Sequence, residues 1–168
     1  AEVSDNVTKD LLVPDMSAKL MVSASLKSRS EQRLIVALGY LGLLPMLFCV
    51  LLMETSFGLS LLKAYSLSIL SFLCGNWWAT PLMRSNNRPG DVQQVLLLSN
   101  VMVITAVISV TFMGHLSLIV LALLFGCLVL GERYLAVFRR QPVYYRSMRV
   151  VVTTIAVALH LAAYAGSR

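Results

Sequence analysis

Few residues in this sequence combine an ionisable group with an apolar neighbourhood, and Glu132 is the most suggestive of them. It directly follows the fourth long apolar run. A carboxylate at such a depth in a membrane usually pairs with an opposite charge, and it otherwise marks a proton path. We expect Arg84, Arg146 and Arg149 on the same side as Glu132, so we favour a structural ion pair. A proton relay would need carboxylates near the midplane, and the sequence places none there.

A basic cluster lies between the fourth and fifth apolar runs, with Tyr144 and Tyr145 inside it. Its members are Arg139, Arg140, Arg146 and Arg149. Each basic group near an anionic lipid surface contributes about 1 kcal/mol to binding. The cluster therefore suits an anionic phospholipid headgroup, although basic loops also set topology without any bound lipid.

The second apolar run carries small residues at helical spacing. They are Ala64, Ser68, Ser71, Gly75 and Ala79, at steps of four, three, four and four. Small residues let two helices approach closely, and such packing drives helix association in lipid. We therefore predict a helix-packing face, with this run as the central helix of a bundle. The alternative is that the small side chains leave room for a ligand or a substrate path.

Asn76, Trp77 and Trp78 follow near the end of the same run. Tryptophan commonly anchors a helix at the headgroup level, so anchoring is the simplest interpretation of the pair. The Asn76 amide lies deeper and needs a partner within the bundle. The three residues are also candidates for contact with a ligand or a partner protein.

His115 and His160 fall on the same expected side of the membrane and are weak candidates for a metal or haem site. Two isolated histidines do not make up a ligand set. We expect His115 to be solvated and His160 to hydrogen-bond across a helix pair beside Thr153 or Tyr164. No metal site and no cofactor are therefore predicted.

The cysteines and the motif inventory add no catalytic centre. Cys49, Cys74 and Cys127 lie within apolar runs without a CxxC pair, and buried thiols behave as small hydrophobes. The sequence has no nucleophile with a base, no glycine-rich phosphate loop and no paired carboxylates. We predict a protein that is not an enzyme.

The elements that hold these residues are membrane spans. The chain is 58% hydrophobic and 13% charged, with a mean hydropathy of +0.78, whereas a soluble domain is roughly 25% charged. About 20 apolar residues cross a bilayer as a helix. Five runs meet or approach that length, so we predict an all-α, five-helix membrane domain over 34–164 with spans at about 34–53, 61–82, 95–113, 116–135 and 147–164.

Two spans have special features. Pro45 lies inside the first span and predicts a kink near Leu41 to Pro45. The fifth span is the shortest and reaches spanning length only by including 147–149. The alternative to a fifth span is a four-span protein whose C-terminal helix lies in the membrane interface.

The basic residues predict the orientation of the chain. Twelve of the 14 lysines and arginines fall in segments on one side of the five spans, and Lys63 and Arg168 fall on the other. Cytoplasmic loops are rich in Lys and Arg, so residues 1–33 form a cytoplasmic tail and 165–168 a short periplasmic one. The formal net charge of +6 has the same origin, and no nucleic-acid-reading element accompanies it.

Several stretches together resemble a known family. They are Gly39-Tyr40-Leu41-Gly42-Leu43-Leu44-Pro45, residues 65–78 with Ile69-Leu70-Ser71-Phe72-Leu73, and Tyr145-Arg146 to Arg149 leading into Thr153. They resemble the bacterial inner-membrane proteins of the domain of unknown function 3429, related to a mitochondrial transmembrane protein. The resemblance covers 34–164. The family pattern Gly-Gly-x-His-Trp-Gly corresponds here to residues 74–79, where Trp77 replaces the histidine. The resemblance implies a membrane topology more than an activity.

The combination of packing faces and missing catalytic groups favours an accessory or assembly subunit of a larger complex in a bacterial inner membrane, with the bilayer and other membrane subunits as partners. The alternative is a small transporter or channel subunit. For that role Pro45, Asn76 and Asn100 would mark broken or polar helix positions along a path.

Overall fold

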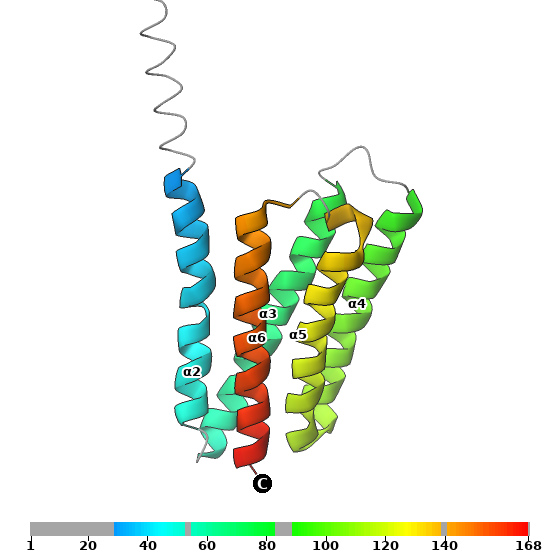
Figure 1. Cartoon of the computed structure of the whole chain (residues 1–168). Helices are drawn as coiled ribbons and strands as arrows, with labels where there is room; N and C mark the ends of the chain where they lie inside the picture. The colour runs from blue at the N-terminus through cyan, green and yellow to red at the C-terminus, as the bar shows by residue number, and fades with distance from the viewer. Residues whose placement is uncertain (1–28, 53–54, 83–88, 139–140, 168) are drawn as a thin grey trace, which may run out of the picture. The chain divides into compact units, whose positions relative to one another are not determined.

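A computed structural model describes residues 29–52, 55–82, 89–138 and 141–167, and these segments are helical apart from short turns. The chain divides after Leu38 into two units. In the first unit, the described residues 29–38 form part of a helix. The second unit, from Gly39 onward, contains all of the labelled elements in Figure 1.

The predicted disturbance near Pro45 is present as a break in the helix at Gly42. Residues 29–41 are helical, Gly42 is a turn, and α2 (Leu43–Leu51) continues. A proline removes one backbone hydrogen bond, and neighbouring helices can satisfy the groups it frees. Here the Tyr65 hydroxyl donates to the Gly42 carbonyl at 2.8 Å. The break is therefore stabilised from the next helix.

The remaining elements alternate long helices with two short 3₁₀ turns. They are α3 (Ser56–Leu82), α4 (Pro89–Phe112), η1 (Gly114–Leu116), α5 (Ser117–Tyr134), η2 (Ala136–Phe138) and α6 (Val143–Gly166). Five helices are long and apolar enough to cross a membrane, the first being Arg29–Leu51 and the last Val143–Gly166. The predicted all-α, five-span fold is confirmed. The last helix has 24 residues, more than the sequence estimate gave it.

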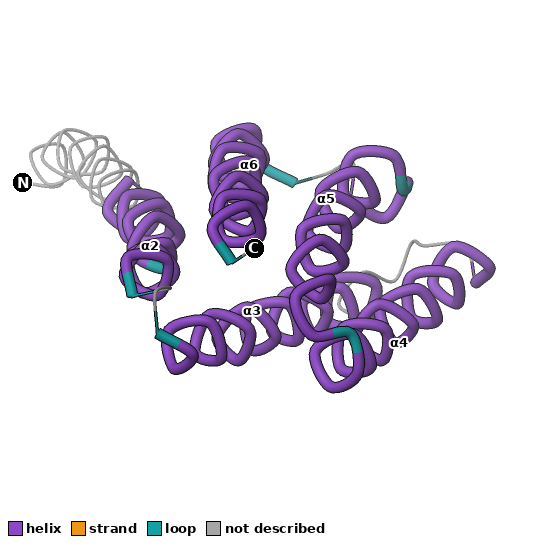
Figure 2. Tube along the Cα trace, turned by 90° about the horizontal axis from the view of Figure 1, so that it is seen from below, coloured by secondary structure: helices purple, strands orange, loops and turns teal. Residues whose placement is uncertain are grey.

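Within the second unit, α6 packs most closely against α5, and α3 against α4. Helix α3 is tilted, so that it lies beside α2 at one end and approaches α4 and α5 toward the other (Figures 1 and 2). Viewed along the bundle in Figure 2, α6 lies between α2 and α5. The C-terminal helix is thus part of the bundle along its length.

Large apolar side chains cover the outside of these helices. Examples are Phe112 at 80% exposure, Phe72 at 70% and Leu97 at 68%. A soluble monomer rarely exposes apolar patches of more than a few hundred Å². Together with the helix lengths, this surface identifies a multi-pass membrane protein. The inner core contains leucines, Trp77, Phe125 and Phe138.

The turn between α2 and α3 depends on Gly58. Thr55 caps α3, since its hydroxyl accepts from the Gly58 N–H at 3.1 Å and donates to the Leu52 carbonyl at 2.8 Å. A Cβ on Gly58 would lie 2.2 Å from the Leu52 carbonyl oxygen, which is a backbone atom. Only glycine fits this approach without moving the chain.

Gly58→Ala is expected to lower the free energy of unfolding by about 1–3 kcal/mol, because the methyl group must displace backbone. The change can be measured by thermal unfolding in detergent. Gly75→Ala is the control, since a Cβ there meets nothing within 4 Å. Equal stability of the two variants would contradict the role of Gly58.

Lys63 secures the hairpin between α4 and α5. Its Nζ donates to the Gly114 carbonyl at 2.6 Å, and the Ser117 hydroxyl donates to the same oxygen at 2.6 Å. Gly114 has a φ of +52°, which glycine adopts without strain. The ammonium thus joins α3 to the turn that reverses the chain.

Lys63→Met is expected to destabilise the protein by about 1–2 kcal/mol, because methionine keeps the apolar stem and loses a charged hydrogen bond. Hydrogen exchange should also become faster at residues 113–117. If exchange at this turn stayed as in the wild type, Lys63 would be only a surface group.

Candidate functional site

The centre of the site is a buried ion pair between α5 and α6. Arg149 donates from Nη2 to Glu132 Oε1 at 2.8 Å and from Nε to Oε2 at 3.2 Å. The residues are only 5% and 8% exposed. Two parallel bonds of this kind fix both side chains. The ion pair predicted for Glu132 is present, and Arg149 is its partner.

Trp77 completes this arrangement from α3. Its Nε1–H donates to Glu132 Oε1 at 3.2 Å, and its ring centroid lies 5.1 Å from that of Phe138 in η2. A Cβ on Gly131 would lie 2.3 Å from the ring, so the indole packs directly on α5 where a side chain is missing. Trp77 is completely buried and does not anchor the helix at the surface.

A cavity of about 250 Å³ lies beside the ion pair. Its walls come from the end of α3, the end of α5, η2 and the start of α6. The lining residues are the aromatic Trp77, Phe138, Tyr144 and Tyr145, the polar Asn76, Thr80, Glu132 and Gln141, and Pro142. The Gln141 Oε1 atom is buried and has no hydrogen-bond partner among the residues that the structure describes. The cavity is therefore polar and aromatic, with an unused acceptor.

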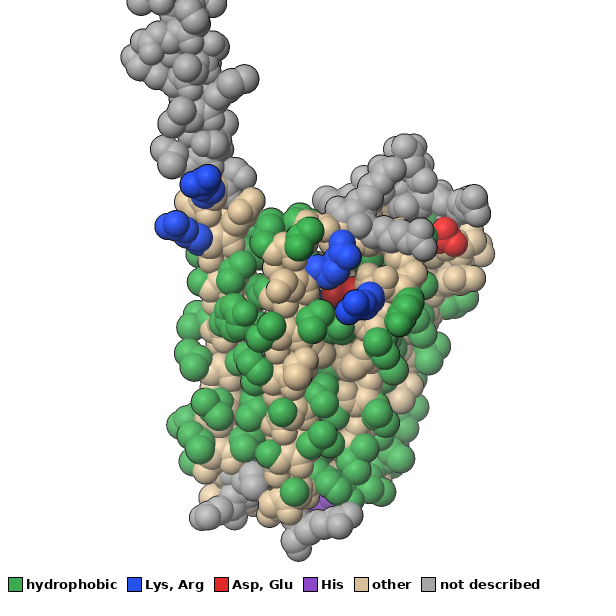
Figure 3. All heavy atoms as spheres, viewed as in Figure 1, with side chains coloured by type: hydrophobic (Ala, Val, Ile, Leu, Met, Phe, Trp, Pro, Cys, Tyr) green, Lys and Arg blue, Asp and Glu red, His purple; other side chains and the backbone are tan. Residues whose placement is uncertain are grey.

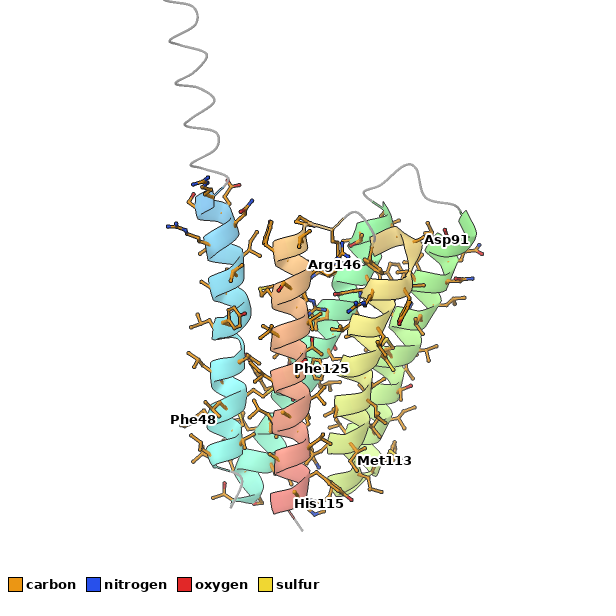
Figure 4. All side chains as sticks on the ribbon, in the orientation of Figure 1. Phe48, Asp91, Met113, His115, Phe125 and Arg146 are labelled. Atoms are coloured by element: carbon orange, nitrogen blue, oxygen red, sulfur yellow. The ribbon has the colours of Figure 1, made fainter. Side chains whose placement is uncertain are left out.

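Charged side chains gather at this end of the second unit. Over α5 and α6, Figure 3 shows apolar side chains along most of the face and an acidic patch between basic ones where α6 begins. Figure 4 places Arg146 at this end, and His115 and Met113 at the opposite end. The site lies at one end of the long apolar helices of the second unit.

The small-residue face of α3 does not pack within the chain. Ala64, Ser68, Ser71, Gly75 and Ala79 are all exposed. The buried face of α3 instead carries larger residues such as Leu62, Leu70 and Trp77. The prediction that these small residues pack against helices of the same chain is therefore wrong, because larger side chains fill the bundle better, whereas α3 itself does pack against α2, α4 and α5. Contact with another chain stays a prediction.

The three residues 76–78 separate in the structure. Trp77 is buried, Trp78 is 43% exposed, and Asn76 is exposed at the wall of the cavity. The expected partner of the Asn76 amide within the bundle does not occur among the described residues. Asn100 is the other polar position considered for a transport path. Its side-chain amide donates to the Leu96 carbonyl of the same helix at 2.8 Å.

The predicted anionic-lipid cluster is only partly available. Arg139 and Arg140 lie outside the described residues. Arg149 is buried and paired with Glu132, so it does not offer its charge to a lipid, which corrects the prediction. Arg146 is exposed, with Nη2 3.5 Å from the Gln141 carbonyl oxygen. It is the described member of the cluster that faces outward.

The two histidines are not brought together. His115 is exposed in η1, as predicted. His160 is completely buried, its Nδ1 lies 2.8 Å from the Ala156 carbonyl oxygen, and its ring lies 5.5 Å from that of Phe125. The predicted bond across a helix pair is therefore wrong, since His160 bonds within α6 and its Nε2 has no hydrogen-bond partner in the described part of the chain.

The described residues contain no group of three potential metal ligands. Cys49 and Cys74 are buried and free, in keeping with small apolar side chains, whereas Cys127 is exposed. None of the three thiols lines the cavity described above.

Comparison with known proteins places the chain in a family. The family model described as "Protein of unknown function (DUF3429)" matches residues 32–165. The chain belongs to this family. No curated protein and no solved structure matches the chain. The match covers all five helices and the whole site of this DUF3429 protein.

Sequence reasoning missed Gln141, Phe138 and Gly131 as parts of the site. Phe138 and Gln141 lie in a short connection after the apolar run, where no periodic pattern indicates what they contact. Trp77 stands where the resembled pattern has histidine, and both residue types offer a ring N–H donor. This shared N–H donor indicates that the side chain at position 77 contacts a hydrogen-bond acceptor.

Proposed function

We propose that this protein is a non-enzymatic accessory or assembly subunit of a larger complex in a bacterial inner membrane. The observation that carries the proposal is the bare small-residue face of α3. It runs from Ala64 to Ala79, about 22 Å along the helix at 1.5 Å per residue. This length is most of the ~30 Å hydrocarbon core.

Such a face suits a helix from another chain. Apolar burial gives no net driving force between helices in lipid, so close backbone approach and packing must supply it. A Cβ at Gly75 would meet nothing within 4 Å, and Ser68 satisfies its hydroxyl on the Ala64 carbonyl at 2.9 Å. The face is therefore open at Gly75, and the Ser68 hydroxyl needs no partner from another chain.

The ionisable groups of the site support a structural role. Glu132 is held by Arg149 and Trp77 together, so its carboxylate is fixed at the junction of α3, α5 and α6. A base or nucleophile in catalysis must exchange a proton or a bond, which this pairing opposes. The alternative role in transport has no such specific observation in its favour.

The orientation belongs to the same proposal, with the N-terminus in the cytoplasm and the C-terminus in the periplasm. Arg133, Arg146 and Arg149 lie near one end of the second unit, and Lys63 contacts the turn at the other end. This distribution supports a cytoplasmic site under the positive-inside rule. Fusing a periplasm-dependent phosphatase to the C-terminus should give an active enzyme, and an inactive, stable fusion would contradict the orientation.

Gly75→Leu tests the subunit proposal. The variant should keep its fold, because the position is open and leucine favours helix over glycine. Affinity purification from native membranes in mild detergent should recover a stoichiometric membrane partner with the wild type. With Gly75→Leu, the amount of co-purified partner should be at least tenfold lower.

Ala158→Leu, on an exposed position of α6, is the matched control and should keep the partner. Recovery of the chain alone from several detergents would overturn the proposal. If Gly75→Leu recovered as much partner as the wild type, the partner would not bind at this face of α3, and the argument would be overturned as well.

A further inference from the structure

Two side-chain oxygens of residues that line the cavity, Glu132 Oε2 and Gln141 Oε1, can accept hydrogen bonds that no described residue donates. Among the described residues, Glu132 Oε1 accepts from Trp77 Nε1 and Arg149 Nη2, and Oε2 accepts only from Arg149 Nε. A carboxylate oxygen offers two lone pairs, so Oε2 keeps one. Gln141 lines the same cavity, and its buried Oε1 atom has no hydrogen-bond partner in the part of the chain that the structure describes. A buried acceptor without a donor destabilises the folded state, so a ligand that supplies a donor binds favourably here.

The aromatic walls favour a cation among the donors that could satisfy these atoms. Trp77, Phe138, Tyr144 and Tyr145 line the cavity. The faces of aromatic rings attract ammonium groups within about 6 Å of the ring centroid. A primary ammonium also offers three donors, enough for Glu132, Gln141 and a third polar wall residue such as Asn76.

The size and the mouth of the cavity suit one end of a lipid headgroup. Its volume of about 250 Å³ admits several non-hydrogen atoms, given about 30 Å³ for one water in the liquid. Arg146 is exposed one helical turn after Pro142, and its guanidinium reaches the Gln141 carbonyl. It can pair with a phosphate while an ammonium a few bonds away enters the cavity.

We propose that this cavity binds the primary ammonium group of an aminophospholipid headgroup, with Arg146 taking the phosphate. The ammonium donates to Glu132 Oε2 and Gln141 Oε1 between the aromatic rings. The Glu132–Arg149 pair stays intact, so the lipid completes the site without replacing a protein contact. This binding is separate from the α3 face and holds whether or not the chain joins a complex.

The test is lipid retention by the full chain, delipidated in detergent and analysed by native mass spectrometry. Three probes are phosphatidylethanolamine, its N-acetyl derivative, which lacks the ammonium, and phosphatidylglycerol. We expect at least tenfold higher retention of the first. Equal retention of the N-acetyl derivative or of phosphatidylglycerol would overturn the proposal, the latter in favour of simple anionic-lipid attraction.

Free ethanolamine and phosphoethanolamine form a further arm of the same experiment. We expect neither to displace the lipid at equal concentration, because the acyl chains and the Arg146 contact add to its affinity. Displacement at equal concentration would assign the cavity to a soluble amine and overturn the lipid proposal.

Gln141→Leu separates binding from folding. Leucine removes the unpartnered acceptor, so stability without lipid should stay equal or rise. Retention of phosphatidylethanolamine should fall about tenfold. Gln94→Leu, at an exposed position on α4, is the matched control and should bind as the wild type does. Wild-type retention by Gln141→Leu would overturn the assignment of the ammonium to this cavity.

Discussion

Arg149→Met should lower the free energy of unfolding by about 3–5 kcal/mol, because it leaves the Glu132 carboxylate buried without its cation. Methionine fills a similar volume, so the loss reports charge more than packing. The Trp77 N–H would then be the one described donor left to Glu132. Unfolding in mixed detergent micelles measures the change.

The matched double variant, Glu132→Leu with Arg149→Met, removes both charges at once. Replacing a buried ion pair by apolar groups is often neutral or stabilising. The double variant should therefore recover most of the stability, apart from about 1 kcal/mol for the Trp77 N–H left without its acceptor. If the double variant were as unstable as Arg149→Met alone, the loss would come from packing and the pair would not explain it. Arg146→Met, which removes an exposed charge on the same helix, should change stability by less than about 0.5 kcal/mol.

The helices of this protein could be predicted because lipid imposes a simple condition. A chain crossing hydrocarbon must satisfy its backbone internally, so a charge-free run of about 20 residues is sufficient evidence for a helix. The boundaries were less certain at the ends of spans. Residues 143–146 join α6 although they include two tyrosines and the charged Arg146, because a helix continues into the headgroup region without a sequence signal that marks the membrane boundary.

The ion pair was predictable in kind and only partly in detail. Glu132 had three candidate arginines, and its position next to an apolar run made pairing the expected outcome. Arg149 is the partner because it lies six residues after the start of α6, level with Glu132, and is buried there. The choice depends on how α5 and α6 pack, which the spacing of charges along a sequence does not contain.

The direction of each α3 face could not be predicted. In a soluble helix the apolar face turns inward, but in lipid both faces are apolar, so hydropathy no longer distinguishes inside from outside. The small-residue spacing predicts an inward face, and the structure turns it outward. The pattern predicts Trp77 as a surface anchor for the same reason. Its burial depends on Gly131, which lies far away in sequence and leaves space for the indole.

Trp77→Ala should destabilise the protein by about 3–5 kcal/mol, since it opens a large cavity at the junction of three helices. It also leaves Glu132 with Arg149 as its only described donor and removes the contact with Phe138. Thermal unfolding in detergent measures the loss. Trp78→Ala is the neighbouring control, because that side chain is 43% exposed, and it should cost less than about 1 kcal/mol. Similar losses for both variants would mean that Trp77 contributes as a surface anchor and not as part of the site.

Gly131→Ala provides an independent test of the same contact. The added Cβ would lie 2.3 Å from the Trp77 ring, so the indole must move, at a cost of about 1–3 kcal/mol. In a Trp77→Leu background the ring atoms that cause the clash are gone. The cost of Gly131→Ala should then nearly disappear, because residues in direct contact give non-additive effects. An equal cost in both backgrounds would show that Gly131 is needed for the helix backbone, and that the indole does not depend on it for its position beside Glu132.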